Sequence, residues 1–260
     1  MRPNTVKQKW REGQVTIGAW LSIPSSFSAE LMAHQDYDWI CVDTQHGAME
    51  FDDAFTMLQA ISTTETIPFV RVGWNDPRLI MKYLDAGAYG VVVPMINNRA
   101  EAEAVVRAVR FPPVGQRSSG PFRAALYGGP DYMQRANDEI VCIAMVETAE
   151  GLAKVDEIAS TPGLDAIYIG PSDLNLALGH GYRDEPWEPD HQAAVNKIRE
   201  ACEKHGITPG VHTWGPKYAA RFIEQGFKMV MLSPDAGSMV AGARADLAEL
   251  KLLRESPVKA

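Results

Sequence analysis

The sequence contains little cysteine, and its cysteines are widely spaced. Cys41, Cys142 and Cys202 are the only three in 260 residues, and no pair has Cys-X-X-Cys spacing. An odd, scattered set predicts neither a disulfide framework nor a thiolate zinc site. The sequence therefore indicates a reducing compartment, and we expect a cytoplasmic protein.

Basic residues are outnumbered by acidic ones. Lys and Arg total 25 against 33 Asp and Glu, a net charge of −8. Such a chain attracts neither nucleic acid nor an anionic membrane surface. No apolar run reaches the roughly 18 residues of a membrane span, and the first residues lack the apolar core of a secretory signal. We therefore expect small-molecule partners, with no nucleic acid and no membrane.

Strand-like and helix-like segments alternate along the whole chain. Short apolar runs predict strands at Val15–Leu21, Asp38–Asp43, Ile67–Val72, Tyr89–Pro94, Val141–Glu147, Ala166–Gly170, Thr208–Thr213 and Lys228–Leu232. Helical periodicity predicts helices at Ser28–His34, Asp52–Ser62, Pro77–Ala86, Arg99–Arg110, Ala149–Ala159, Asp190–His205, Pro216–Gln225 and Ser238–Arg254. No linker interrupts this alternation, so the fold class is α/β, a single (β/α)8 TIM barrel over residues 1–260. In such a barrel the active site lies at the carboxyl ends of the strands.

Two connections are unusually long. Phe111–Ile140 and Asn175–Pro189 are rich in Gly and Pro and are predicted as loops. Long structureless excursions in a compact domain are usually functional. We expect both to help build the mouth of the active site.

Polar side chains gather where the predicted strands end. Because the carboxyl ends of barrel strands meet at one face, these side chains are expected to lie close together. A charged group in such apolar surroundings needs a partner, a metal or water. The residues concerned are Asp43, His46, Arg71, Glu147, Asp173 and His212.

Glu147 and Asp173 are candidate metal ligands. They end consecutive strands, and carboxylate oxygens suit a hard divalent cation that keeps positions open for water and substrate. No spacing of Cys or His indicates zinc instead. We predict Mg²⁺ or Mn²⁺, with Co²⁺ as a further candidate, chelated in addition by a 2-oxo acid.

Arg71 and His46 are candidate catalytic residues. Arg71 follows an apolar run and needs an anion, which is either a substrate carboxylate or carbonyl, or an ion pair with Glu147 or Asp43. His46 lies in a loop after the second strand, where its imidazole can act as a base near neutral pH. Asp43, three residues earlier, is predicted to orient it.

These motifs together resemble the HpcH/HpaI aldolase family. The matching segments are Asp43-X-Gln45-His46-Gly47, Arg71-Val72, Leu84-Asp85-Ala86-Gly87-Ala88-X-Gly90-Val91-X-Val93-Pro94, Val146-Glu147-Thr148 and Gly170-Pro171-Ser172-Asp173-Leu174. The resemblance implies a (β/α)8 barrel that cleaves or forms 4-hydroxy-2-oxo acids with a divalent metal, through the enolate of pyruvate. It also implies a homo-oligomer, a hexamer, with a carboxyl-terminal helix exchanged between subunits.

The resemblance assigns roles to individual residues. It implies that Glu147 and Asp173 bind the metal, that Arg71 binds and polarises the oxo acid, and that His46 with Asp43 transfers protons. The backbone of Gly170, Pro171 and Ser172 would hold the carboxylate of the oxo acid, and Trp20 would line the pocket.

Departures from the family pattern concern the substrate, and one of them is Arg117-Ser118 where relatives have Arg-Gly. Many relatives have Val-Gln-Ile-Glu where this chain reads Ala144-Met145-Val146-Glu147, and losing that Gln would permit a nucleophile such as hydroxypyruvate. The seventh strand ends in His212-Thr213-Trp214, which is more aromatic and polar than in relatives. We expect His212 to contact the substrate.

Other reactions compete with a metal-dependent aldolase. A Schiff-base aldolase needs a lysine inside the barrel, but Lys154, Lys197, Lys204 and Lys217 fall on predicted helices and Lys228 opens a strand. An acyl-CoA lyase needs a basic groove, for which Arg117 and Arg123 are the only obvious material. An oxaloacetate decarboxylase would use the same enolate. A catalytically silent oxo-acid-binding protein is the alternative from a different class.

The last predicted helix spans residues 236–254. Apolar residues recur at helical spacing from Met239 to Leu253, which predicts that one face is buried. Packing on its own barrel is the simplest interpretation, and exchange with a neighbouring subunit rests on the resemblance alone.

Overall fold

The computed structural model describes residues 1–255, and these form a closed barrel of parallel strands in the order β1 to β8. Each strand pairs with its sequence neighbours, and β8 closes the ring on β1. The strands are β1 (Thr16–Leu21), β2 (Trp39–Asp43), β3 (Ile67–Arg71), β4 (Gly90–Val93), β5 (Val141–Val146), β6 (Ala166–Ile169), β7 (Thr208–Val211) and β8 (Met229–Pro234). The predicted barrel is confirmed, with every strand where the apolar runs placed it.

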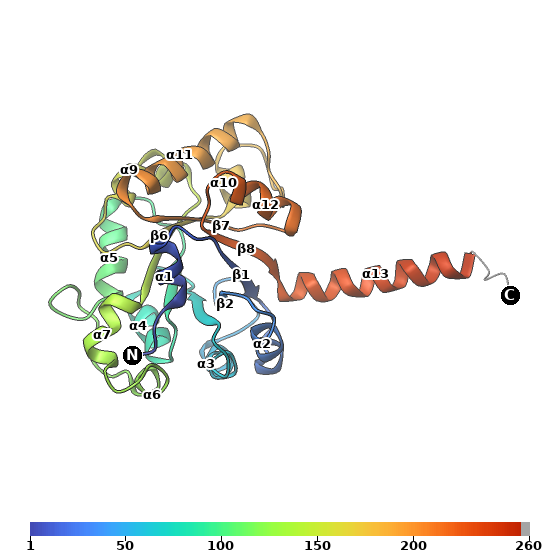
Figure 1. The fold of residues 1–260 in the computed structure, drawn as a ribbon. Helices are drawn as coiled ribbons and strands as arrows, with labels where there is room; N and C mark the ends of the chain where they lie inside the picture. Colours follow the sequence, from blue (N-terminus) through green and yellow to red (C-terminus); the bar gives the residue numbers. More distant parts are fainter. Residues whose placement is uncertain (256–260) are drawn as a thin grey trace.

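Helices cover the outside of the barrel (Figure 1). They are α1 (Thr5–Arg11), α2 (Ser26–Ala33), α3 (Phe51–Ile61), α4 (Pro77–Asp85), α5 (Arg99–Val109), α6 (Phe122–Gly128), α7 (Tyr132–Glu139), α8 (Ala149–Ala153), α9 (Val155–Ala159), α10 (Pro171–Ala177), α11 (Pro189–His205), α12 (Pro216–Glu224) and α13 (Asp235–Glu255). Among the described residues, no helix combines the length and hydropathy that a membrane crossing requires.

Local sequence explains where these elements form. Strand β4 is buried along its whole length, because helices cover its outer face and side chains fill the barrel inside. Helix α4 begins at Pro77 behind Asp76, whose side chain accepts the backbone N–H of Arg78. Helix α11 ends at Gly206 in the left-handed conformation, which glycine adopts without strain.

The two long connections differ from the prediction. Phe111–Ile140 is not a structureless loop, since it contains α6 and α7. Its Gly and Pro residues separate two short helices that the sequence pattern did not reveal. The connection predicted to begin at Asn175 begins inside α10, and the predicted helix Ala149–Ala159 is divided into α8 and α9 at Lys154.

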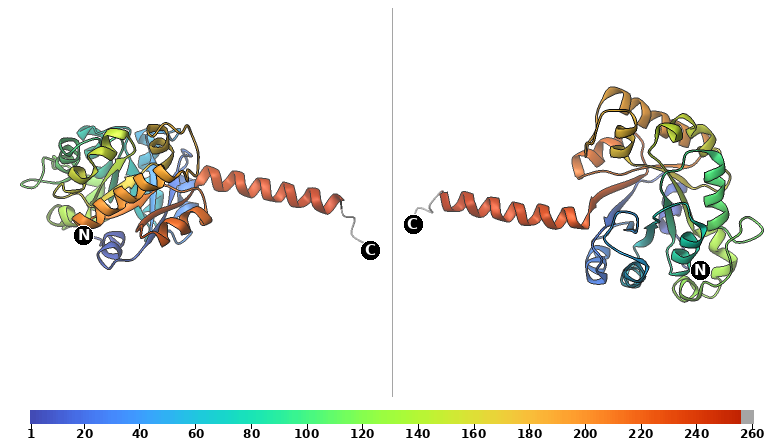
Figure 2. Two further views of the ribbon diagram at one scale, coloured as in Figure 1. Left: turned by 90° about the horizontal axis from the view of Figure 1, so that it is seen from above. Right: turned by 180° about the vertical axis from the view of Figure 1, so that it is seen from behind.

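Helix α13 does not pack on its own barrel. It extends away from the rest of the chain in all views (Figures 1 and 2). Asp235 is its only buried residue, and Leu247, Leu250 and Leu253 are each more than half exposed. The simplest interpretation of its apolar face, contact with its own barrel, is therefore wrong.

Candidate active site

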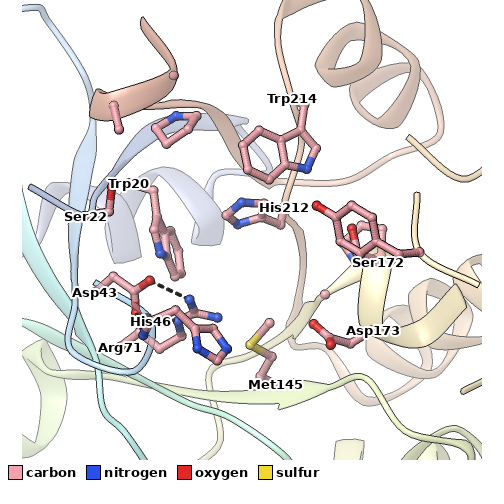
Figure 3. A pocket seen from close by; sticks show the side chains of 16 residues that line it. Trp20, Ser22, Asp43, His46, Arg71, Met145, Ser172, Asp173, His212 and Trp214 are labelled. Carbon is pink, nitrogen blue, oxygen red and sulfur yellow. Dashed lines mark hydrogen bonds and ion pairs between the residues drawn. The ribbon is translucent and has the colours of Figure 1, made fainter. Parts of the chain in front are cut away.

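A cavity of about 440 Å³ lies at the carboxyl ends of the strands. Figure 3 shows side chains from several strands converging on it. Its walls are formed by Trp20, Ser22, Asp43, His46, Arg71, Met145, Gly170, Pro171, Ser172, Asp173, Tyr182, His212, Trp214, Pro234, Ala236 and Gly237. Every residue that the sequence predicted for the site lines this cavity, except Glu147, which lies beside the lining residues Met145 and Gly170.

Asp43 and Arg71 form a buried ion pair in this wall. They end β2 and β3 and are register neighbours on the adjacent strands. The Arg71 Nε and Nη2 atoms donate to the two Asp43 carboxylate oxygens at 2.9 and 2.6 Å. Arg71 is 8% exposed and Asp43 3%. Burial opposes ionisation of Asp43, but hydrogen bonds and charge from Arg71 lower its pKa overall.

The sequence left open whether Arg71 forms an ion pair with Glu147 or with Asp43, and in the structure its protein partner is Asp43. The carboxylate of Asp43 also accepts the backbone N–H groups of Gln45 and His46. Gly47 allows this tight turn, since a Cβ there would lie 2.2 Å from the carbonyl oxygen of Asp43. Among the described residues, the carboxylate of Asp43 forms a hydrogen bond with the backbone N–H of His46 and none with its imidazole. The predicted orientation of the imidazole by Asp43 is therefore not what the structure shows.

The second charged group is Glu147, directly after β5. It is 4% exposed, and its Oε1 accepts the backbone N–H of Met95 at 3.0 Å. Met95 has a φ of 58°, a strained left-handed conformation for a residue other than glycine. Burial, with a smaller contribution from the charge of Asp173, raises the pKa of Glu147 to about 7 despite the Met95 hydrogen bond and the charge of Arg71.

These two carboxylates fit a divalent cation. Glu147 is a buried acid facing a second acid, an arrangement that costs free energy unless a positive charge lies between them. Glycine at position 170 allows the backbone to pass close to the Glu147 carboxylate, since a Cβ there would lie 2.6 Å from Oε2 of Glu147. No group of three or more His, Cys, Asp or Glu side chains within residues 1–255 could hold a metal. The protein thus supplies two oxygen donors, and water and substrate must supply the others.

The remaining wall is aromatic, and we call Trp20, Tyr168, His212 and Trp214 the aromatic wall. Trp20 stacks on Tyr168 at 5.5 Å and meets His212 edge-on at 5.1 Å between ring centroids. The guanidinium carbon of Arg71 lies over the Trp20 ring, 5.0 Å from its centroid. Trp20 therefore separates the ion pair from His212, as Figure 3 shows.

Several residues that line the cavity were not predicted from the sequence. Ser22, Pro234 and Tyr182 line the cavity although no motif contains them. Ser22 and Pro234 follow or end strands, and that position alone could have identified them. Tyr182 lies in a connection with no distinguishing pattern and gave no such signal.

Comparison with known proteins decides the family. The sequence model of the HpcH/HpaI aldolase/citrate lyase family matches residues 16–241. The chain belongs to this family. It is 39% identical over 250 residues to a hydroxypyruvate/pyruvate aldolase of Rhizorhabdus wittichii, covering 96% of this chain and all of that protein (100%). It is 37% identical over 245 residues to the 4-hydroxy-2-oxo-heptane-1,7-dioate aldolase of Klebsiella pneumoniae, covering 93% and 92%.

A solved structure of this aldolase family has the same fold. The HpcH/HpaI family protein of Burkholderia cenocepacia aligns with a TM-score of 0.90 at 34% identity, covering 95% of this chain and 99% of that one. The predicted family is confirmed. The chain is a class II aldolase, a carbon–carbon lyase.

Proposed function

We propose that this aldolase cleaves and forms 4-hydroxy-2-oxo acids, releasing pyruvate or hydroxypyruvate and an aldehyde, with the help of a divalent cation. The observation that carries the proposal is a cavity lined by Asp173 and the guanidinium of Arg71, with the buried carboxylate of Glu147 directly behind its lining residue Gly170 and close enough to feel the charge of both. Relatives at 39% and 37% identity are named for substrates of this class.

Glu147 and Asp173 would hold the cation, with Mg²⁺ or Mn²⁺ as the expected metal and Co²⁺ as a further candidate. Two carboxylates without nitrogen or sulfur ligands favour such oxygen-preferring ions. A cation bound there would withdraw electrons from the carbonyl of a 2-oxo acid and make its C3 proton more acidic.

Arg71 would bind the oxo acid and stabilise the enolate oxygen. Its Nε and Nη2 are held by Asp43, and among the described residues Nη1 has no hydrogen-bond partner. That N–H group therefore can donate to a substrate oxygen in a fixed direction. The backbone of Gly170, Pro171 and Ser172, where α10 begins, would hold the carboxylate of the substrate through N–H groups of the first turn, to which Pro171 contributes none.

His46 would transfer the proton. Two histidines line the cavity, and they differ in surroundings: His46 is exposed at the rim, whereas His212 is set in the aromatic wall. Burial and the nearby charge of Arg71 lower the pKa of His212 to about 3, which makes it too weak a base at neutral pH. In the cleavage direction, His46 would take the proton of the 4-hydroxyl as the aldehyde leaves.

The competing reactions gain no support from the described residues. Among the described residues that line the cavity, none is a lysine, so a Schiff-base aldolase would have no nucleophile. Arg117 is 1% exposed and bound to Asp85 and Tyr132, and Arg123 is bound to the carbonyl oxygen of Ala86. Neither forms a basic groove for coenzyme A. Decarboxylation of oxaloacetate would pass through the same enolate, so the site would support it as a side activity.

We further propose that the chain forms a homo-oligomer, a hexamer, through α13. Val240, Leu247 and Leu250 lie on one side of this protruding helix and are at least 46% exposed in the single chain. An exposed apolar stripe of this length favours contact with another copy. Replacing Leu247 and Leu250 by Glu should lower the mass measured by light scattering, whereas an unchanged mass would exclude this helix from the interface.

The compartment that we propose is the cytoplasm. Cys41, Cys142 and Cys202 are all buried free thiols in the structure. Free thiols persist in a reducing environment.

The test of the proposed reaction is a retro-aldol assay. Protein treated with a chelator is given a panel of 4-hydroxy-2-oxo acids, and pyruvate or hydroxypyruvate release is followed before and after Mg²⁺ or Mn²⁺ is added. We expect release only with metal. Release that chelation does not affect would refute the cation site at Glu147 and Asp173.

A further inference from the structure

His212 adds an imidazole ring to a wall whose other members are Trp20, Tyr168 and Trp214. Its ring points from the end of β7 into the cavity, between Trp20 and Trp214 (Figure 3). The ring centroids lie 5.1 Å from Trp20 and 5.4 Å from Trp214, both edge-on. These contacts fix the orientation of the imidazole, so its nitrogen atoms have defined surroundings.

One ring nitrogen is committed to the protein. The Nδ1 of His212 lies 3.3 Å from the hydroxyl of Tyr168. Tyr168 is fully buried, and burial raises the pKa of its phenol well above the usual value, so the hydroxyl keeps its proton. Among the described residues this hydroxyl has no other hydrogen-bond partner, so it donates to Nδ1. A neutral imidazole that accepts at Nδ1 carries its own proton on Nε2.

The other ring nitrogen is open to the cavity. No described residue forms a hydrogen bond with Nε2, and this nitrogen is not fully buried. Because burial and Arg71 keep the imidazole neutral, Nε2 is an uncharged N–H donor facing the substrate. A donor that loses water when substrate enters must find an acceptor, or its desolvation opposes binding.

We propose that His212 determines specificity by donating a hydrogen bond from Nε2 to a hydroxyl oxygen of the substrate outside the 2-oxo acid group. This inference rests on the proposed aldolase reaction. It predicts that the enzyme prefers hydroxylated substrates, with the hydroxyl either on C3 of the oxo acid, as in hydroxypyruvate, or beside the carbonyl of the aldehyde, as in glycolaldehyde.

The charge of the cavity supports a hydroxyl rather than a second carboxylate. Among the described residues that line it, Arg71 is the only Arg or Lys, and it belongs to the oxo acid end. A distal carboxylate would meet the aromatic wall and a neutral imidazole, which cannot compensate its charge. A neutral donor among aromatic rings suits a neutral acceptor.

The test compares four substrate pairs, pyruvate or hydroxypyruvate with acetaldehyde or glycolaldehyde. For H212F, which keeps an aromatic ring but lacks both nitrogens, kcat/KM should fall about 10- to 100-fold for pairs that carry the recognised hydroxyl. Pairs without it should change less than about 3-fold on the same reasoning. A loss that follows hydroxypyruvate places the hydroxyl on the oxo acid, and a loss that follows glycolaldehyde places it on the aldehyde.

Two further variants test whether the effect of H212F comes from the lost hydrogen bond and not from a folding defect. Y168F keeps the ring but removes the hydroxyl that fixes the tautomer, so it should reduce the same preference by a few-fold. H34Q changes an exposed imidazole at the opposite end of the barrel, after α2, and should leave the preference unchanged.

The outcomes separate the two claims. An equal loss for all four pairs in both H212F and Y168F overturns the role of His212 in specificity while leaving the aldolase reaction intact. A wild-type protein that is inactive with all four pairs, with metal present, overturns the proposed reaction and this inference with it.

Discussion

The two sides of the cavity are built on different principles. On one side, four acidic or basic groups lie close to one another at or after the ends of β2, β3, β5 and β6, namely Asp43, Arg71, Glu147 and Asp173. On the other, the aromatic wall holds a neutral histidine among rings. The charged side suits the chemistry of an enolate, which any 2-oxo acid shares, whereas under the proposal above the aromatic wall would contact the part of the substrate that varies.

The difference also appears in protonation. On the charged side, Arg71 lowers the pKa of Asp43 overall, despite the opposing effect of burial. On the aromatic side, burial and the same Arg71 charge lower the pKa of His212 to about 3 and leave it neutral. One guanidinium therefore keeps one neighbour charged and the other uncharged. Variants on each side should affect reaction rate and substrate choice separately.

The largest effect is expected for E147Q on the charged side. Losing a cation ligand removes several kcal/mol of transition-state stabilisation, so kcat/KM should fall about 10⁴-fold. Calorimetric titration should also show weaker binding of Mn²⁺. E150Q is the matched control, because Glu150 is exposed three residues later and pairs with Lys154 at the surface. Equal activity of E147Q and wild type would remove Glu147 from the site.

H46A tests the proton transfer at the rim. Loss of a general base lowers turnover about 10²- to 10⁴-fold, and we expect kcat to fall while KM changes little. The rate is to be measured from pH 6 to 9 in wild type and variant. If His46 is the base, the pH dependence of the rate changes in H46A, whereas a retained profile with an unchanged rate would assign the proton transfer to another group.

D43N tests the ion pair that holds Arg71. Breaking a buried pair leaves an uncompensated charge and costs about 3 kcal/mol of stability, so the melting temperature should fall by several degrees. D76N is the control, because Asp76 pairs with exposed Arg78, and Asn caps α4 as well as Asp does. Similar melting temperatures for the two variants would show that the buried pair contributes no more than a surface one.

The smallest effect concerns His212 and pH. Its folded pKa of about 3 lies below the value near 6.5 of an unfolded chain, so between these values the unfolded state binds more protons. Stability should therefore fall by about 2 kcal/mol from this group between pH 7 and pH 5. H212Q should lose correspondingly less stability over this interval in urea denaturation, and H34Q should behave as wild type. Parallel losses in H212Q and wild type would contradict a neutral, buried His212.

Much of the barrel was predictable, and particular segments show why. The run Val91-Val92-Val93 is apolar at consecutive positions because both faces of β4 are covered. The connection Phe111–Ile140 was predicted as a loop because Gly and Pro residues precede its first short helix and separate it from the second. Short helices carry too few residues for a periodic pattern and depend on tertiary contacts.

The candidate site was predictable in its members but not in its contacts. A polar residue that ends an apolar strand must lie at the barrel face, which identified Arg71, Glu147 and His212. Which partner Arg71 takes depends on strand register, and the register places Asp43 beside it. Tyr168 was not singled out, because an aromatic residue inside a strand is indistinguishable from core.

The fold class and the set of chemical groups follow from the amino-acid sequence alone, since alternation and strand-end polarity are local properties of the chain. The contacts of those groups depend on tertiary structure. Asp43 pairs with Arg71, Tyr168 pairs with His212, and α13 packs on its own barrel through its first turn alone. The physical reason is that hydrogen-bond partners and buried faces depend on how distant segments approach one another. Periodicity shows that α13 has an apolar side but carries no information on what covers it.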